Sequence, residues 1–353
     1  MANVNGFPLL SKRALLETFT PPDWLIDGVL QRRFVYSLTG QTGHAKTAIA
    51  LLLSELVSSV GLANPALGVH AVNKGQVIYL VGENPDDVIM RLIGADSLRT
   101  DDPLSDRIQF VLGVVNLAQA WDACATDAPA EGYDLVIVDT SAAYFLGADE
   151  NANTELGDHA RLLRSYTALP GGPAVLALCH PRKFVGSVEE LIPRGGGAFL
   201  AEMDGNLTLR RIAEGMVELH HNKIRGPGFE PILLRLEKIT CQRLVDAKGK
   251  QITTVRAVVA SEIDAQREEN RVVEDEDRGM IVMLAEPDLS VAEIADRCHW
   301  FYGNGDPDKS RVQRMLGRLE KDHLVKKIRT KWQLTENGKV IARKTALRAD
   351  RIG

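Results

Sequence analysis

The residues from Leu38 to Thr47 carry the clearest chemistry in this sequence. They read Leu-Thr-Gly-Gln-Thr-Gly-His-Ala-Lys-Thr, and they stand between a β-rich run, Phe34 to Ser37, and an apolar run, Ala48 to Leu53. The order of strand, glycine loop and helix is typical of a P-loop, whose backbone N–H groups bind the phosphates of a nucleotide. In such a loop Lys46 reaches the β- and γ-phosphate oxygens, and Thr47 places its hydroxyl on Mg²⁺.

The glycines of this loop give its backbone the freedom to turn donors toward a phosphate. Ala45 replaces the usual last glycine; its methyl group narrows the loop but leaves every N–H donor in place. We therefore expect ATP and Mg²⁺ as cofactors. The predicted nucleotide-binding residues are Gly40, Gln41, Thr42, Gly43, His44, Ala45, Lys46 and Thr47.

Two carboxylates are candidates to complete this site. Asp139 ends the apolar strand 135–138, the position in which P-loop enzymes hold the Mg²⁺ shell. The next residue is Thr140 and not Glu, so the base that positions the attacking water must come from elsewhere. Glu83 is the candidate, because it follows the strand 76–81 at the edge where ligands bind in open α/β sheets. A purely structural role for Glu83 as a helix-capping acid is the alternative.

The spacing of apolar runs predicts an α/β fold. Continuous apolar strands that alternate with helices are typical of a parallel sheet covered on both faces. The later segments predict antiparallel strands that extend the sheet. The predicted parallel strands are 76–81, 108–112, 135–138 and 174–178, and the predicted antiparallel strands are 206–212, 216–223, 231–239 and 255–263.

This set of motifs resembles the RecA-type ATPases. The P-loop, Glu83, Asp139 and the pair Cys179-His180 carry the resemblance. Within these ATPases, three further segments are similar to the plasmid and phage helicases of RepA type: Pro22 to Leu30, Gly82 to Pro85, and Arg194 to Leu200.

The resemblance has consequences for architecture and assembly. It implies a RecA-like core over residues 31–263, preceded by an N-terminal arm, residues 1–30, that packs between subunits. It also implies a ring-shaped homo-oligomer, usually a hexamer, with each ATP between neighbouring subunits.

Three further residues acquire roles through the resemblance. His180 takes the place of the γ-phosphate sensor; a histidine satisfied at a strand end is the alternative. Lys223 and Arg225 match the Lys-x-Arg element that reaches into the neighbour's ATP site, where a cation stabilises charge on the transferred phosphoryl group. The alternative is that Lys223 and Arg225 belong to a solvent-exposed turn without a role in catalysis.

Two loops lie on the face that lines the central channel in such rings. The first, 147–157, is acidic and polar, so it is poorly suited to bind the phosphates of a DNA strand. The second, from Arg182 to Gly197, combines Arg182, Lys183, Phe184 and Arg194 with flexible glycines. Proteins bind single-stranded DNA without regard to base sequence through cations that contact the backbone and aromatic rings that stack on the bases. Inert surface loops remain the alternative.

The charge of the chain is unevenly distributed. The whole chain carries a net charge of −5, but residues 308–353 hold 14 Lys+Arg against 5 Asp+Glu, a net +9. The acidic segment 264–277 is predicted to be a linker or an exposed connecting helix.

Residues 278–353 are predicted to form a winged helix. A capping box at Ser290 begins one helix, a second helix follows with an apolar face from Val312 to Leu319, and residues 324–339 form a hairpin. The basic charge favours duplex DNA as the partner, and protein docking is the alternative.

Composition limits the class of protein. With 353 residues, 45% hydrophobic and 25% charged, the chain is predicted to be globular with two domains. No stretch approaches the roughly 18 apolar residues of a membrane helix, so we expect a cytoplasmic protein without a membrane partner. The cysteines, scattered at 124, 179, 241 and 298, indicate neither a disulfide framework nor a zinc site.

The sequence thus predicts an ATP- and Mg²⁺-dependent, ring-forming motor that acts on DNA in plasmid or phage replication. Two other classes remain open. One is a RecA-type recombination or repair ATPase that does not unwind DNA. The other is a DNA-binding regulator that uses ATP as an assembly switch.

Overall fold

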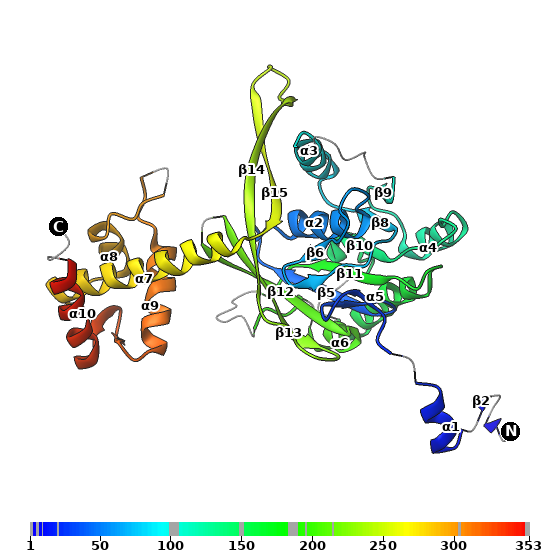
Figure 1. Cartoon of the computed structure of the whole chain (residues 1–353), viewed down its shortest axis with the longest axis horizontal. Coiled ribbons are helices and arrows are strands. Elements are labelled where there is room, and N and C mark those ends of the chain that lie inside the picture. Colours follow the sequence, from blue (N-terminus) through cyan, green and yellow to red (C-terminus); the bar gives the residue numbers. More distant parts are fainter. Residues whose placement is uncertain are drawn as a thin grey trace. The chain divides into compact units, whose positions relative to one another are not determined.

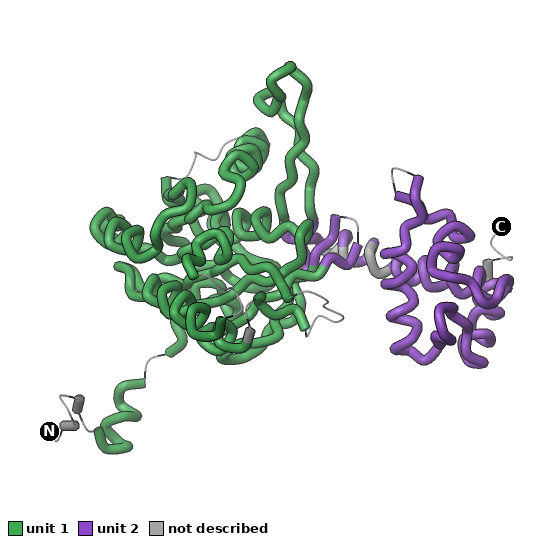
Figure 2. Tube along the Cα trace, turned by 180° about the vertical axis from the view of Figure 1, so that it is seen from behind, with its two compact units in different colours: residues 1–210, 218–232, 236–258 green, residues 211–217, 233–235, 259–353 purple. Residues whose placement is uncertain are grey.

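The chain divides into two compact units (Figure 2). Unit 1 comprises residues 1–210, 218–232 and 236–258, and unit 2 comprises residues 211–217, 233–235 and 259–353. The computed structural model describes residues 10–19, 21–98, 106–147, 152–182, 190–194, 196–213, 215–302 and 305–349, and the backbone of two short strands, β1 (Asn3–Val4) and β2 (Phe7–Pro8).

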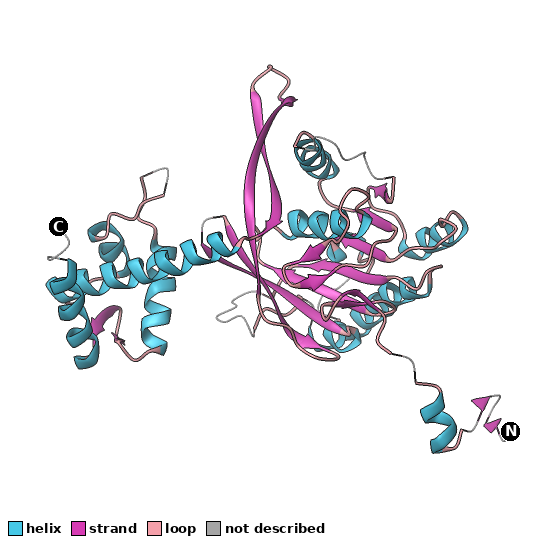
Figure 3. Ribbon diagram, in the orientation of Figure 1, coloured by secondary structure: helices cyan, strands magenta, loops and turns pink. Residues whose placement is uncertain are grey.

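A nine-stranded sheet with helices on both faces organises the first part of the chain (Figures 1 and 3). Its strands lie in the order β15-β14-β13-β12-β5-β11-β10-β8-β9. Their bounds are β5 (Val35–Gly40), β8 (Val77–Val81), β9 (Ile108–Leu112), β10 (Leu135–Asp139), β11 (Ala174–Cys179), β12 (Gly205–Ala213), β13 (Met216–Ile224), β14 (Ile232–Val245) and β15 (Gln251–Val259).

The central strands are parallel, as the continuous apolar runs predicted. β5 pairs with β11, β11 with β10, β10 with β8, and β8 with β9, each in parallel register. Because β11 separates β5 from β10, the P-loop and Asp139 follow strands that are not neighbours in the sheet. The expected α/β fold with a mostly parallel sheet is therefore confirmed.

Two details of the sheet differ from the prediction. The strand at 206–212 was expected to be antiparallel, but β12 pairs parallel with β5, with Leu207 opposite Leu38. The reason is that α6 (Gly196–Glu202) lies between β11 and β12, so the chain crosses over before β12 begins. In addition, β15 ends at Val259 and not at residue 263, because Ser261 caps the helix that follows.

Helices cover both faces of the sheet. On one face the core includes Val136 and Val175 from the strands with Leu117, Ala160 and Phe199 from three helices. These helices are α4 (Leu117–Thr126), α5 (Asn153–Ser165) and α6. On the other face α2 (Lys46–Ser58), which is buried along most of its length, contacts β5, β8, β9 and β10. This double burial explains why the strands lack polar alternation.

No helix in the part of the chain that the structure describes is long and apolar enough to span a membrane.

Shorter elements complete unit 1. The remaining elements are α1 (Lys12–Glu17), β3 (Trp24–Ile26), β4 (Leu30–Gln31), β6 (Ala66–Leu67), β7 (His70–Ala71), α3 (Pro85–Asp96) and the 3₁₀ helices η1 (Ser141–Tyr144) and η2 (Tyr166–Ala168).

Unit 2 has a hydrophobic core of its own, which includes Met280, Ile294, Met315, Leu316 and Val325. Its first helix contains the acidic segment expected to be a linker or connecting helix, and the C-terminal part of this helix enters the core through Met280. The elements are α7 (Glu262–Ala285), α8 (Val291–Arg297), α9 (Lys309–Lys321), β16 (Val325–Ile328), β17 (Lys331–Leu334) and α10 (Glu336–Ala349).

Candidate nucleotide site

The glycine loop connects β5 to α2 by a backbone that partly adopts the left-handed region. Gly43 has φ 83°, and Ala45, which caps α2, has φ 61° and ψ 31°. A left-handed conformation costs a residue with a Cβ atom about 1–2 kcal/mol relative to the right-handed one. The replacement of glycine by Ala45 therefore strains the backbone as well as narrowing the loop.

Lys46 is held inside this loop. Its Nζ donates a hydrogen bond to the carbonyl oxygen of Gly40 at 2.7 Å, and Nζ lies 3.4 Å from that of Gln41. Its exposed fraction is 8%. Burial lowers the pKa of Lys46, whereas the negative charge of Asp139 opposes this shift. A buried ammonium group whose hydrogen bonds go to neutral carbonyls is suited to receive an anion.

Asp139 ends β10 as a buried carboxylate. Its Oδ2 accepts a hydrogen bond from the Tyr79 hydroxyl at 2.8 Å. Burial raises the pKa of Asp139, and hydrogen bonds from Tyr79 and Thr47 counteract the rise. Among the residues that the structure describes, no cluster of three or more His, Cys, Asp or Glu could hold a metal by itself. One carboxylate beside a threonine fits Mg²⁺, which proteins bind through few side chains together with phosphate oxygens.

Glu83 follows β8 and lies beside the end of β10. The Thr140 hydroxyl donates a hydrogen bond to Glu83 Oε1 at 2.7 Å. The backbone N–H of Gly82 also donates to the carbonyl oxygen of Asp139 at 2.7 Å. These bonds fix the orientation of the Glu83 carboxylate relative to the end of β10.

One open pocket of ≈ 970 Å³ brings most of the predicted site residues together. Lys46, Thr47, Glu83, Asp139 and His180 all line it, with Thr42, Gly43 and Ala45 of the glycine loop. Other lining residues were not among the predicted site residues, including Asp87, Arg91, Leu236 and Val255.

These additional residues differ in how far the sequence could have revealed them. Asp87 and Arg91 form an ion pair of 2.7 Å at i, i+4 spacing on α3, directly after Glu83, which is a detectable signal. Leu236 and Val255 belong to β14 and β15, which return to the pocket from more than a hundred residues away. No local pattern predicts that return.

His180 follows β11 and lines two pockets. It contributes to the nucleotide pocket and to a second pocket of ≈ 470 Å³ that also contains His159, Phe145 and Phe199. Burial raises the pKa of the preceding Cys179 to about 12, so this thiol stays protonated. The position agrees with the sensor role expected of His180, which remains a prediction.

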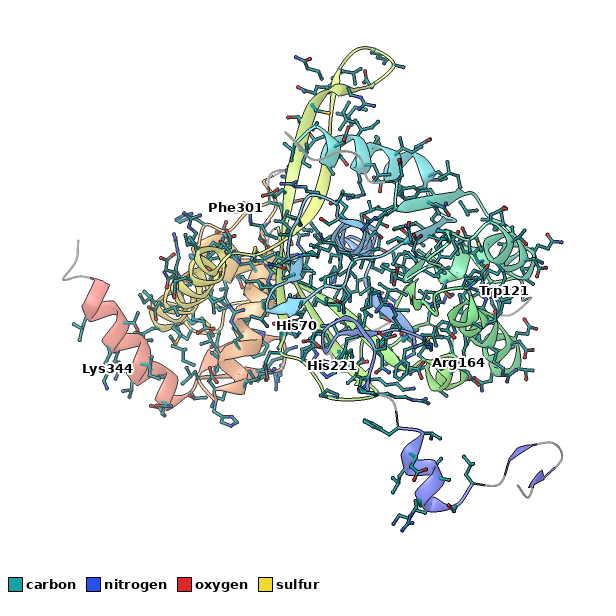
Figure 4. All side chains as sticks on the ribbon, turned by 45° about the vertical axis from the view of Figure 1, so that its right-hand side comes forward. His70, Trp121, Arg164, His221, Phe301 and Lys344 are labelled. Carbon is teal, nitrogen blue, oxygen red and sulfur yellow. The ribbon has the colours of Figure 1, made fainter. Side chains whose placement is uncertain are left out.

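Lys223 and Arg225 are not among the residues that line this pocket. Lys223 Nζ donates to the carbonyl oxygen of Leu200 at 2.6 Å. Arg225, exposed at 62% of its side chain, forms an ion pair of 2.9 Å with the buried Asp204. Asp204 also accepts a hydrogen bond of 2.9 Å from Arg164 of α5, labelled in Figure 4. Within this chain the two cations therefore contact residues away from the nucleotide pocket.

The two channel loops are described only in part. Residues 148–151 of the first loop lie outside the described residues, as do residues 183–189, with Lys183 and Phe184, and residue 195 of the second. The ends of the second loop meet beside His180: the N–H of Arg194 donates to the His180 carbonyl at 2.7 Å, and that of Arg182 to Ile192 at 3.2 Å.

Comparisons with known proteins give one family match and a distant structural match. A family model described as "AAA domain" matches residues 6–184, about half of the chain, which include the glycine loop, Glu83, Asp139 and His180. A solved structure, "ATPase Domain of G40P", matches with 15% identity and a TM-score of 0.44 over 63% of this chain and 85% of that chain. No curated protein matches the sequence. By its family match, the chain belongs to the AAA domain family.

Proposed function

We propose that this protein is an ATP- and Mg²⁺-dependent DNA motor, a replicative helicase of RepA type that works in the cytoplasm as a homo-oligomeric ring, usually a hexamer, on single-stranded DNA. One observation carries the proposal: Lys46, Thr47, Glu83 and Asp139 line a single pocket at the carboxyl edge of a parallel sheet. Membership of the AAA domain family supports the assignment of this pocket to a nucleotide.

Each side chain has a defined task in this proposal. Lys46 binds the β- and γ-phosphates through the ammonium group that now contacts Gly40. Thr47 and Asp139 hold Mg²⁺, which supplies positive charge to the phosphate oxygens. Glu83, oriented by the Thr140 hydroxyl, positions the attacking water and accepts its proton.

The neighbouring subunit completes the site in this proposal. Lys223 and Arg225 do not line the pocket of their own chain, and Arg225 is largely exposed. In trans, the Arg225 guanidinium stabilises charge that develops on the transferred phosphoryl group. His180, between the pocket and the second loop, senses the γ-phosphate and passes its presence to the loop that holds single-stranded DNA.

Unit 2 is assigned to duplex DNA. Its order of three helices followed by the antiparallel pair β16–β17 supports a winged helix, and we propose that it anchors the motor on double-stranded DNA. Residues 1–30 are proposed to pack between subunits.

DNA unwinding tests the proposal directly. The full chain should separate a forked duplex when ATP and Mg²⁺ are present, and Lys46→Ala should abolish this activity because it removes the phosphate-binding ammonium. DNA-stimulated ATP hydrolysis without strand separation would favour the recombination or repair ATPase instead. Turnover too slow for movement, with ATP-dependent assembly, would favour the DNA-binding regulator.

A further inference from the structure

The charges of unit 2 are segregated. Residues 308–353 carry 14 Lys+Arg and 5 Asp+Glu, yet residues 259–353 as a whole carry 18 of each. The acids of α7 and of the segment after it thus offset the basic excess. Affinity for a polyanion therefore depends on which cations remain exposed and not on the net charge of the unit.

Two of the three arginines of α9, Arg311 and Arg318, pair with acids of α7. The Arg311 guanidinium donates two hydrogen bonds to the carboxylate of Asp275, at 2.9 and 2.6 Å, and also lies over the Trp300 ring at 4.6 Å. Arg318 forms an ion pair of 2.7 Å with Glu276. The two-bond fork engages the Arg311 guanidinium strongly, and Arg318 is engaged through its Nε alone, so both arginines already have acidic partners within the unit.

The outward face of α9 offers little to a DNA groove. Its exposed residues include Gln313, Gly317 and Glu320. A Cβ atom added at Gly317 would meet nothing within 4 Å, which confirms that this face is open. The carboxylate of Glu320 would repel the phosphate backbone. Gln313 carries an exposed amide, and the exposed lysines of α9, Lys309 and Lys321, stand at the two ends of the helix, whereas a recognition helix needs several cations or amides along one face.

The β16–β17 hairpin, which we call the basic hairpin (residues 325–334), has the opposite character. It contains four cations, Lys326, Lys327, Arg329 and Lys331, and no acid. All four are exposed. The antiparallel register places Lys326 opposite Gln333 and Ile328 opposite Lys331, so Lys326 and Lys331 share one face.

The other face of the basic hairpin anchors it. Val325 and Leu334 face each other and are buried, with exposed fractions of 3% and 5%. Acids also lie near the hairpin. Glu336 pairs with Lys339 at 2.7 Å, Asp288 accepts a hydrogen bond from Gln333, and Glu293, which accepts from the backbone N–H of Ser290 at 2.7 Å, also interacts electrostatically with Lys331. The hairpin is thus a fixed ribbon with an exposed basic face and tip.

We propose that the basic hairpin, and not α9, binds the phosphate backbone of duplex DNA. The inference rests on the proposed function, in which unit 2 takes the duplex. The basic sequence offers cations on both α9 and the hairpin as candidates for phosphate contact, and the structure pairs Arg311 and Arg318 of α9 with acids of α7. Contacts of this kind are electrostatic and insensitive to base sequence.

The test is the salt dependence of duplex binding by the full chain, measured by fluorescence anisotropy with a blunt duplex and without ATP. The hairpin variant is Lys326→Gln/Lys331→Gln. The matched control, Arg343→Gln/Lys344→Gln, removes as many exposed cations from α10, on which Figure 4 labels Lys344. Gly317→Glu places an acid on the open face of α9.

Loss of two phosphate contacts should make the log–log salt slope shallower by about 1.8 and weaken binding about 60-fold at roughly 0.1 M salt. The α10 control and Gly317→Glu should leave the slope unchanged and alter the affinity by less than about threefold. An equal loss of duplex affinity in the α10 control would overturn the inference. So would a loss of duplex affinity in Gly317→Glu when the hairpin variant binds normally.

Two further outcomes separate the inference from the proposed function. A chain that unwinds forks but does not bind blunt duplex retains the motor and refutes the hairpin assignment. In that case an acidic protein becomes the partner of the hairpin. A chain whose duplex affinity depends on the hairpin but which does not unwind DNA retains the inference and refutes the helicase.

Discussion

At the scale of residues, a short set of hydrogen bonds orients the polar groups of the nucleotide pocket. Tyr79 fixes the Asp139 carboxylate, and Thr140, next in sequence, fixes Glu83. Two acids with different surroundings can perform different tasks: the buried Asp139 suits a metal ion, and Glu83 suits a water molecule. The sequence could identify both acids because each follows an apolar strand, but the link through Thr140 required the structure.

The first prediction concerns this division between acids. Glu83→Gln should bind ATP with little change but reduce the rate of hydrolysis about 10²-fold, because an amide cannot accept the proton of the attacking water. Asp87→Asn is the control, since Asp87 lines the same pocket and loses the same charge. It should lower the rate only a few-fold. Steady-state phosphate release measures both; parental activity in Glu83→Gln would place the base elsewhere.

At the scale of elements, α7 contributes both charge and packing to unit 2. Asp275 has an exposed fraction of 6% and accepts both hydrogen bonds from Arg311. The sequence suggested a linker or an exposed helix here, because the segment is acidic and almost without aromatics. That pattern describes the acids correctly, but it cannot reveal that α9 carries their partners some forty residues later.

Removal of this buried carboxylate charge should destabilise unit 2. Asp275→Asn leaves Arg311 with a neutral partner and should cost about 1–2 kcal/mol, less than a fully buried pair because Arg311 is partly exposed. Glu276→Gln, which affects a more exposed pair, should cost about 0.5 kcal/mol. Hydrogen exchange of the α9 amides measures both. Equal protection in the two variants would contradict the proposed importance of the Asp275–Arg311 pair.

Elements with continuous apolar runs were predictable, and elements defined by distant partners were not. The strands β8, β10 and β11 fall where the sequence placed them, because both of their faces are buried, and the edge strand β9, which is only partly buried, also lies at its predicted residues. The direction of β12 was wrong, since it depends on the crossover through α6 and on pairing with β5. The contribution of Leu236 and Val255 to the pocket likewise depends on long-range return of the chain.

At the scale of the whole molecule, the proposed ATP hydrolysis depends on assembly of several chains. One chain supplies a pocket with Lys46, Glu83 and Asp139, but it holds Lys223 and Arg225 at a different place, beside Leu200 and the buried Asp204. If these cations act on ATP, a second copy of the chain must bring them to the pocket. Activity would then be a property of the interface between subunits and not of the isolated chain.

Mixing two inactive variants is the most direct test of this central claim. Arg225→Ala chains keep an intact Lys46, and Lys46→Ala chains keep an intact Arg225. Each variant alone should be inactive, whereas random mixed rings should recover roughly a quarter of the parental ATP hydrolysis, the share of interfaces that combine both intact residues. Recovery of this size is the predicted result. No recovery in rings proven to contain both variants, or full activity of Arg225→Ala alone, would contradict hydrolysis at a site shared between subunits.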